Sequence, residues 1–393
     1  MKVLGLIFTI NVSLETWVES GLFYREKRIY EEHLKHGNFD KIIWFTYGVN
    51  DVELYTDLVT KGLLDARIEV VPMPKWIKCP YRYQVYSVLL PFIQKKYCKQ
   101  IDIIKTNQMG GAWTAEIISK WYKCTFWLRT GYTYSTTLHK KYMQCKKVIE
   151  KFKLREKEIF YRYIEKRLYN KCDFATVSSN HDKEMIKNDY KIPDKKITVI
   201  TNFVDCRLFR PIPIEKQERF VFVGRLSKEK NIFNIISAVV EAGYGLDIYG
   251  DGILKDELVS FVKKNNYDVE FKGLIENEKL PMVLNQYKYF ILCSEYEGMP
   301  KTLLEAMACG LICIGSDVSG INEVLCDGKN GFLAQRTSME AILECIIRAK
   351  EAEQILKEKI SKKAREYIVN NNSIDVIIEN EMRLVKKRQE CFE

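Results

Sequence analysis

Two carboxylates, Glu297 and Glu305, stand eight positions apart in the stretch "SEYEGMPKTLLEAMACG". Pro300 between them suits the start of a helix, because its missing N–H costs little there, and Gly310 suits the end. A carboxylate before a helix often serves only the helix dipole, which accounts for Glu297 but leaves Glu305 unexplained in an apolar run. Because carboxylates accept hydrogen bonds from diols, the spacing predicts contacts with two sugars at different depths.

A second stretch, "FVFVGRLSKEKN", carries residues that can hold an anion. Gly224 permits a tight turn after an apolar strand. Arg225 and Lys230 follow it, and a helix begins after Lys230. Two cations beside a helix start can bind a phosphate or diphosphate, although such a loop alone is usually just solvated. Backbone N–H groups after Pro300 add further phosphate donors, so the two stretches together predict a diphosphate site.

These residues need a scaffold, and the chain supplies it as apolar runs that alternate with helical patterns. Such alternation is typical of α/β domains with parallel, doubly wound sheets. Two series of runs, separated by residues 209–219, predict two Rossmann-like domains whose ligands bind beyond the carboxyl ends of the strands. The expected strands lie at residues 2–10, 41–48, 67–73, 101–107, 124–131, 173–179 and 197–203, and then at 219–225, 246–250, 268–273, 289–294 and 311–316.

The opening residues "MKVLGLIFTINVS" predict a buried first strand rather than a signal peptide, because no small-residue cleavage site follows them. No apolar run approaches the roughly 18–20 residues that a membrane span needs. The twelve cysteines include no C-x-x-C pair. We therefore expect reduced cytosolic thiols, with neither a zinc site nor a disulfide framework.

The net charge of +10 is concentrated in residues 71–170, which hold 21 basic and 6 acidic residues. Such a block favours an anionic partner, either a membrane face or a nucleic acid. The alternative is a general excess of Lys from an AT-rich genome. We expect no nucleic acid as a partner, because no nucleic-acid-binding motif occurs and the second half is acidic overall.

The stretch from Glu297 to Gly310 resembles the E-x7-E signature of the retaining glycosyltransferases of family 4. Further segments resemble that family in the expected order, and the similarity covers residues 173–335. They are "ITVITNFVDCRLFRP", "VGRLSKEKN", "YGDG", "FKGLI" and "GSDVSGINEVLCDGKNGFL".

The resemblance implies the GT-B fold, an α/β fold in which two Rossmann-like domains face each other across a cleft. Residues 1–209 with 374–393 would form the acceptor domain, and residues 210–373 the donor domain. The last helix would cross back to the first domain.

The resemblance also implies roles for individual residues. Arg225 and Lys230 would hold the donor diphosphate, Glu297 would face the donor sugar, and Glu305 would face the nucleotide ribose. The remaining donor contacts would come from Gly224, Gly273, Leu274, Gly298, Met299, Pro300 and Lys301, with the base near Gly273 and Leu274.

The first half departs from the family pattern. Many members carry a Gly-Gly pair after the first strand and a His after a later one, whereas this chain has a single Gly21 and "FWLRTGY". Arg129 is therefore the candidate catalytic residue of the acceptor domain, where it would contact the donor phosphate or an anionic acceptor. The alternative places Arg129 in a strand-end network.

As a member of this family, the protein would transfer a sugar with retention from a nucleotide-diphosphate donor. UDP is expected first, with GDP and ADP open. The acceptor would be a hydroxyl of a glycan or lipid-linked saccharide in lipopolysaccharide or capsule synthesis. The resemblance implies that no cofactor and no metal is needed, which fits the absence of a DxD motif and the presence of two cations. The protein would be cytoplasmic and peripheral to the inner membrane face through residues 71–170. A sugar-nucleotide epimerase, a phosphorylase, an inactive scaffold and a basic nucleic-acid-binding protein are the alternatives.

Overall fold

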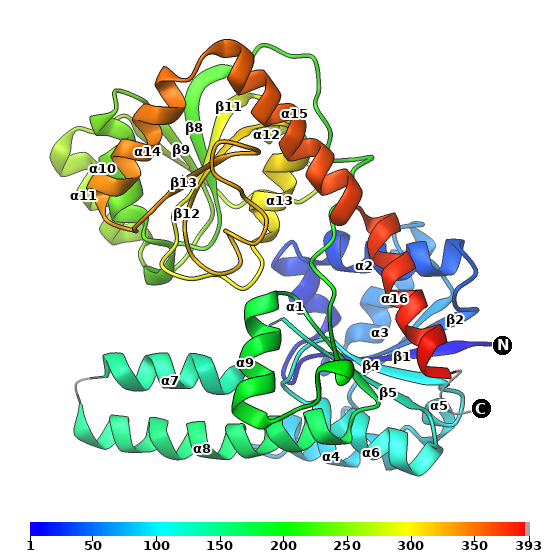
Figure 1. The fold of residues 1–393 in the computed structure, drawn as a ribbon. Coiled ribbons are helices and arrows are strands. Elements are labelled where there is room, and N and C mark those ends of the chain that lie inside the picture. The colour runs from blue at the N-terminus through cyan, green and yellow to red at the C-terminus, as the bar shows by residue number, and fades with distance from the viewer. Residues whose placement is uncertain (132, 146, 390–393) are drawn as a thin grey trace. The chain divides into compact units, whose positions relative to one another are not determined.

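The computed structural model describes residues 1–131, 133–145 and 147–389. They form two units, Met1–Ile200 with Ile378–Glu393, and Thr201–Ile377 (Figure 1). The divisions lie nine residues before and four residues after the positions 209 and 373 expected from the sequence. Val204 explains the earlier division, because it is buried in the core of the second unit and pairs with Ser373.

The first unit is built on a seven-stranded sheet in the order β3-β2-β1-β4-β5-β6-β7, and all its pairings are parallel. Each strand lies within one of the predicted runs, and β1 is fully buried, as the apolar start of the chain predicts. The strands are β1 (Val3–Ile7), β2 (Lys41–Phe45), β3 (Ile68–Val71), β4 (Ile103–Thr106), β5 (Thr125–Thr130), β6 (Phe174–Val177) and β7 (Ile197–Val199).

Helices connect these strands, as parallel pairing requires. One connection, between β5 and β6, is a hairpin of two long helices, α7 and α8 (Figure 1). The helices are α1 (Leu14–Glu19), α2 (Phe23–Lys35), α3 (Asp51–Thr60), α4 (Arg82–Ile93), α5 (Lys95–Cys98), α6 (Ala112–Tyr122), α7 (Tyr134–Gln144), α8 (Val148–Lys171) and α9 (Asn180–Tyr190), with the short η1 (Asp194–Lys196).

The second unit repeats the plan with a six-stranded parallel sheet in the order β10-β9-β8-β11-β12-β13. The last strand was not predicted, because three residues are too few to show a pattern. The strands are β8 (Gln217–Val223), β9 (Leu246–Tyr249), β10 (Val269–Gly273), β11 (Tyr287–Leu292), β12 (Ile312–Ser316) and β13 (Phe332–Ala334). The helices are η2 (Lys228–Lys230), α10 (Ile232–Glu241), α11 (Lys255–Asn265), α12 (Leu280–Asn285), α13 (Lys301–Ala308), α14 (Met339–Glu351) and α15 (Gln354–Asn371). Two doubly wound α/β sheets confirm the predicted fold class.

The last helix, α16 (Ile374–Gln389), begins in the second unit and ends in the first. Its Glu381 is buried there beside β4 and α2. Lys105 Nζ lies 2.7 Å from one carboxylate oxygen, and His33 Nε2 lies 2.9 Å from the other. Lys105 Nζ also lies 3.8 Å from the centroid of the Trp127 ring. This buried cluster anchors the chain end to the first sheet.

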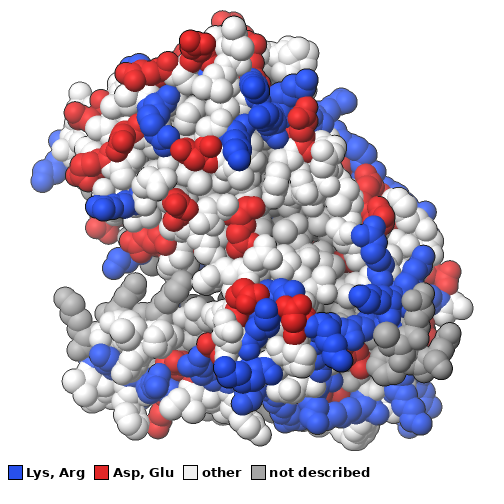
Figure 2. All heavy atoms as spheres, in the orientation of Figure 1, with Lys and Arg blue, Asp and Glu red and all other residues white. Residues whose placement is uncertain are grey.

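Charge is unevenly spread over the surface. Figure 2 shows Lys and Arg side chains gathered over the first unit, in the lower part of the view, and mixed charges over the second. Among the described residues, no helix combines the length and apolar character needed to cross a bilayer. The same residues include eleven cysteines, all unpaired, and no group of three or more side chains placed to hold a metal ion.

Candidate functional site

The candidate residues of the second unit meet at one edge of its sheet. Its strands are parallel, so the loops that follow them leave at the same edge. The chain runs from β8 to β9 and β10 on one side, and β11 lies on the other side of β8. Open α/β sheets bind ligands at such a reversal of strand order. The loops after β8 and β11 carry Arg225, Lys230 and Glu297.

Lys230 and Glu297 form an ion pair across this reversal. Lys230 Nζ lies 2.5 Å from Glu297 Oε1, and Ser294 Oγ donates to the same oxygen at 2.7 Å. The two side chains are 18% and 10% exposed, so both are largely buried and both still reach the surface. The backbone N–H of Glu295 donates to the Glu229 carbonyl at 2.8 Å, which ties the two loops together.

Arg225 lies in the same loop as Lys230 and is exposed. Within the described part of the chain, its guanidinium makes no hydrogen bond or ion pair. An Arg carries several donors in a planar fork that matches phosphate oxygens. Arg225 thus provides unused donors at the same sheet edge as the Lys230–Glu297 pair.

The loop after β11 leads into α13, which begins one residue later than the sequence predicts. Pro300 has ψ 109° and is the N-cap, so Lys301 is the first helical residue. The helix ends at Ala308 with Cys309 as its C-cap. Gly310 follows with φ +72°, and its N–H donates to the Met307 carbonyl at 3.0 Å. Asn202 Nδ2 donates to the Met299 carbonyl at 2.8 Å and supports the loop from the start of the unit.

Two glycines, Gly250 and Gly320, pack closely against the backbone of the candidate loops. A Cβ on Gly250, whose φ is +150°, would lie 1.9 Å from the Gly224 carbonyl oxygen. A Cβ on Gly320, whose φ is +81°, would lie 2.1 Å from the Gly298 carbonyl oxygen. Only glycine allows backbones to approach this closely. The sequence showed Gly250 and Gly320 only as parts of motifs, and the structure gives their packing role.

Glu305 lies deeper than Glu297, as the spacing predicts. It is 2% exposed, and its Oε1 accepts a hydrogen bond from the buried Asn277 Nδ2 at 3.1 Å. At the same sheet edge, Gly273 has φ +75°, and its carbonyl accepts from the Gly250 N–H at 2.8 Å. Leu274, which follows it, exposes an apolar side chain. The edge thus combines cations, carboxylates and exposed apolar side chains.

Arg129 belongs to the first unit and is considered apart. Its Nη1 donates to the Asn107 carbonyl at 2.9 Å, and its backbone N–H donates to Thr106 Oγ1 at 2.9 Å. These contacts join the ends of β4 and β5. They are the contacts expected if Arg129 belongs to a strand-end network, which was the alternative to a catalytic role. A catalytic role for Arg129 stays a prediction.

A Gly-Gly pair, Gly110 and Gly111, follows β4 and not β1. Strand order in the first sheet reverses between these two strands. The Gly110 carbonyl accepts from the Ile10 N–H at 3.1 Å, and a Cβ on Gly111 would lie 3.1 Å from the Tyr47 hydroxyl. The pair was visible in the sequence, but only strand order places it beside the loop after β1.

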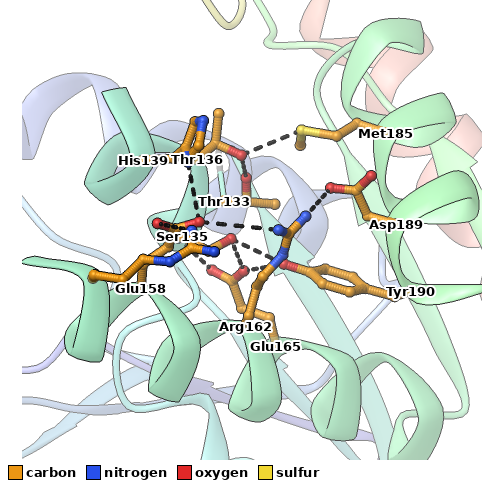
Figure 3. A network of polar contacts seen from close by, with 11 residues as sticks. Thr133, Ser135, Thr136, His139, Glu158, Arg162, Glu165, Met185, Asp189 and Tyr190 are labelled. Carbon is orange, nitrogen blue, oxygen red and sulfur yellow. Dashed lines mark hydrogen bonds and ion pairs between the residues drawn. The ribbon is translucent and has the colours of Figure 1, made fainter. Parts of the chain in front are cut away.

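The sequence did not reveal a polar cluster at the base of the α7–α8 hairpin (Figure 3). The Glu165 carboxylate is fully buried and accepts from the Tyr134 N–H at 2.6 Å and the Ser135 N–H at 3.1 Å. It also accepts from Ser135 Oγ and from the Tyr190 hydroxyl, each at 2.5 Å. Glu165 therefore caps α7 and ties it to α8 and α9.

Glu158, seven residues earlier on α8, forms a second part of this cluster. Its carboxylate accepts from Arg155 Nη1 at 2.9 Å and lies 3.1 Å from His139 Nδ1, while Arg162 Nη2 lies 2.5 Å from Asp189 (Figure 3). A pocket of about 270 Å³ opens among these groups. The sequence signal for this network was the seven-residue spacing of Glu158 and Glu165, which places two acids on one helical face of a basic segment. The network joins three helices and thus has a structural role.

Comparisons with known proteins show the family of the chain. A family model described as Glycosyltransferase Family 4 matches residues 41–208, and one described as Glycosyl transferases group 1 matches residues 207–367. The chain belongs to the family 4 glycosyltransferases. The resemblance drawn from the motifs of the second half is thereby confirmed, and it extends to the first half.

Curated relatives and solved structures support the assignment. An Escherichia coli protein named UDP-Gal:alpha-D-GlcNAc-diphosphoundecaprenol alpha-1,3-galactosyltransferase is 30% identical over 251 residues, which are 57% of this chain and 63% of that protein. A Campylobacter jejuni protein named N-acetylgalactosamine-N,N'-diacetylbacillosaminyl-diphospho-undecaprenol 4-alpha-N-acetylgalactosaminyltransferase is 28% identical over 222 residues, 52% and 59% of the two chains. The chain spans about three fifths of the length of these relatives.

Sucrose-phosphate synthase of Thermosynechococcus elongatus shares the fold over 100% of both chains, with a TM-score of 0.77 and 17% identity. Anabaena HepE, solved with UDP and glucose, matches 98% of this chain and 100% of its own with a TM-score of 0.73 and 15% identity. At these identities the likeness concerns the fold alone, and it confirms the predicted GT-B architecture.

Proposed function

We propose that this family 4 glycosyltransferase moves a sugar, with retention, from a nucleotide-diphosphate donor to a hydroxyl of a glycan or lipid-linked saccharide. The observation that carries the proposal is the Lys230–Glu297 pair at the reversal of strand order, with Arg225 exposed beside it in sequence. A diphosphate needs cations and a sugar needs hydrogen-bond acceptors, and this edge offers both.

In the proposed donor complex, Arg225 and Lys230 neutralise the diphosphate and Glu297 accepts hydrogen bonds from the sugar. Glu305 accepts from the ribose, with Asn277 holding its carboxylate in place. The base rests on Leu274, whose exposed apolar side chain suits a flat ring. UDP is the expected nucleotide, since the E. coli relative is named for UDP-Gal and Anabaena HepE was solved with UDP.

The proposed reaction needs only the donor and the acceptor. The bond between the anomeric carbon and a diphosphate oxygen breaks, and the acceptor oxygen bonds to the same carbon on the same face. The acceptor proton passes to the departing diphosphate. Arg225 and Lys230 stabilise the charge that develops on this leaving group. In this scheme no cofactor and no metal is required.

For the acceptor we propose a lipid-linked saccharide in surface polysaccharide synthesis, at the cytoplasmic face of the membrane. The names of the E. coli and C. jejuni relatives support this, because both contain a diphosphate-linked undecaprenol.

Nucleotide binding tests the proposal directly. UDP at about 100 times its dissociation constant is expected to stabilise the chain by about 2.7 kcal/mol. Thermal unfolding is measured with UDP, GDP, ADP and CDP on the wild type, on Arg225→Ala and on Lys362→Ala, an exposed cation of α15. The shift with one nucleotide should shrink in Arg225→Ala and persist in Lys362→Ala. If no nucleotide shifts the wild type, the donor site is wrong and an inactive scaffold is favoured.

A second expectation concerns Gly320→Ala. The new Cβ would meet the Gly298 carbonyl oxygen at 2.1 Å and displace the sugar-binding loop. We expect nucleotide-sugar affinity to fall about 10- to 100-fold, because small displacements of binding groups have effects of this order. Titration calorimetry measures it. Gly328→Ala is the matched control, since Gly328 has φ +65° but nothing within 4 Å of its Cβ position. An equal loss there would attribute the effect to backbone strain instead.

A further inference from the structure

Helix α8 of the first unit presents an apolar stripe to solvent. Six of its apolar and aromatic side chains are between 58% and 82% exposed. At about 100° of rotation per residue they fall on one face roughly 120° wide. They are Val148, Ile149, Phe152, Ile159, Phe160 and Tyr163.

The opposite face of α8 packs inside the unit. Glu158 and Glu165 lie on it, in the cluster that joins α7, α8 and α9 (Figure 3). Tyr161 packs on Tyr134 of α7 with ring centroids 4.4 Å apart. The exposed stripe therefore points away from α7, and the buried network keeps the helix from rotating to hide it.

A second stripe lies on α4. Val85, Val88, Leu89 and Phe92 follow the spacing of one helical face and are 37% to 49% exposed. Trp121 of α6 is also exposed and meets the Phe92 ring edge-on, with centroids 4.2 Å apart. Helix α4 packs on α6, and α6 packs on α8, along the lower edge of this unit in Figure 1. The two stripes and Trp121 thus lie on three helices that pack in sequence, α4 on α6 and α6 on α8.

Cations border both stripes. On α8, Lys153 and Lys157 flank one side of the stripe and Arg155 flanks the other, and all three are exposed. Exposed cations also lie within and near α4 and next to Trp121 in the sequence, among them Lys78, Arg82, Lys95, Lys96, Lys120 and Lys123. The exposed Glu156 also falls on the α8 face, so this face is apolar with one acid inside a basic border. Apolar faces bordered by cations are typical of helices that lie in the interface of a membrane.

We propose that this docking face, formed by the two stripes, Trp121 and their bordering cations, binds the surface of an anionic lipid bilayer. The inference rests on the proposed function, since a lipid-linked acceptor is reached at such a surface. The apolar side chains enter the headgroup region while Lys and Arg contact anionic headgroups. A second copy of the chain fits less well, because its basic border would meet an identical basic border. A nucleic acid would leave the apolar stripes in water.

Vesicle flotation of the full chain tests the docking face. The wild type is expected to float with vesicles of equal parts phosphatidylcholine and phosphatidylglycerol, and far less with phosphatidylcholine alone or in high salt. The variants Phe152→Ser with Phe160→Ser, and Val88→Ser with Phe92→Ser, should each reduce the floating fraction about tenfold. Lys153→Glu with Lys157→Glu should do the same on anionic vesicles.

The control is Ile253→Ser with Ile355→Ser, two side chains of the second unit that are 90% and 77% exposed. It should float like the wild type. Wild type that stays with the soluble fraction, or stripe variants that float unchanged, would overturn the docking face. If light scattering shows a dimer for the wild type and a monomer for the stripe variants, the face would be assigned to a second copy of the chain. Nucleotide-induced thermal shifts on the same samples report the donor site separately, so either proposal can fail alone.

Discussion

Replacing Lys230 with methionine is expected to lower kcat about 100- to 1000-fold, as the loss of one preorganised charge at a developing anion typically does. Lys230 is held by Glu297 at 2.5 Å, in a loop fixed by the contact between Glu295 and Glu229. A flexible surface lysine would have to be ordered in the transition state, whereas this one already is. The loss should therefore fall on kcat more than on KM, and steady-state transfer assays with UDP-sugars measure it.

Lys228→Met provides the control within the same loop. Lys228 is exposed, two residues before Lys230, and takes no part in the ion pair. It should retain activity within a few-fold of the wild type. Equal losses in the two variants would mean that general charge, and not the position of Lys230, attracts the donor. Full activity of Lys230→Met would remove the proposed role.

Replacing Glu381 with glutamine is expected to destabilise the first unit by about 3 kcal/mol at neutral pH. Burial by itself would raise the pKa of this carboxyl. The Lys105 ammonium and the hydrogen bond from His33 outweigh it and lower the pKa of Glu381 to about 2. A carboxyl with a pKa near 4.5 when unfolded and near 2 when folded stabilises the fold above the higher value. This stabilisation is lost as the pH falls from about 4.5 toward 2.

Urea unfolding at pH 7 and at pH 3 checks this prediction. The difference in the free energy of unfolding between wild type and Glu381→Gln should be larger at pH 7 than at pH 3. Glu379→Gln is the matched control on α16, since Glu379 is 70% exposed and pairs across one turn with Arg383. Its effect should stay within about 0.5 kcal/mol. If this difference in the free energy of unfolding is the same at both pH values, the assigned ion pair is contradicted.

The predicted strands are found because buried parallel strands need continuous apolar runs, and these are local in sequence. The α7–α8 hairpin was not foreseen. Its helix α8 has one apolar face against α7 and another in solvent, which blurs the single-face pattern of an amphipathic helix. Strand β13 was missed because only three residues pair.

The candidate site divides in the same way. Lys230 and Glu297 lie 67 residues apart and were predicted together, because strand order rules and the family motifs both bring them to one edge. Lys105 and Glu381 lie 276 residues apart and gave no signal. A buried Lys in a strand is unremarkable until its partner is known. The close packing of Gly250 on Gly224 and of Gly320 on Gly298 likewise joins residues that are distant in sequence, so no local pattern predicts it.

The path of α16 has a consequence for dissecting the chain. The second unit is one uninterrupted segment, Thr201–Ile377, whereas the first is made of two segments that flank it. A fragment that starts near residue 201 and stops near residue 377 carries every strand of its sheet. A fragment that stops at residue 200 carries every strand of the other sheet but removes the Glu381 carboxylate that Lys105 and His33 contact. If a separate peptide covering residues 374–389 is added to that fragment, the docking of α16 becomes binding between two molecules, and its affinity can be measured.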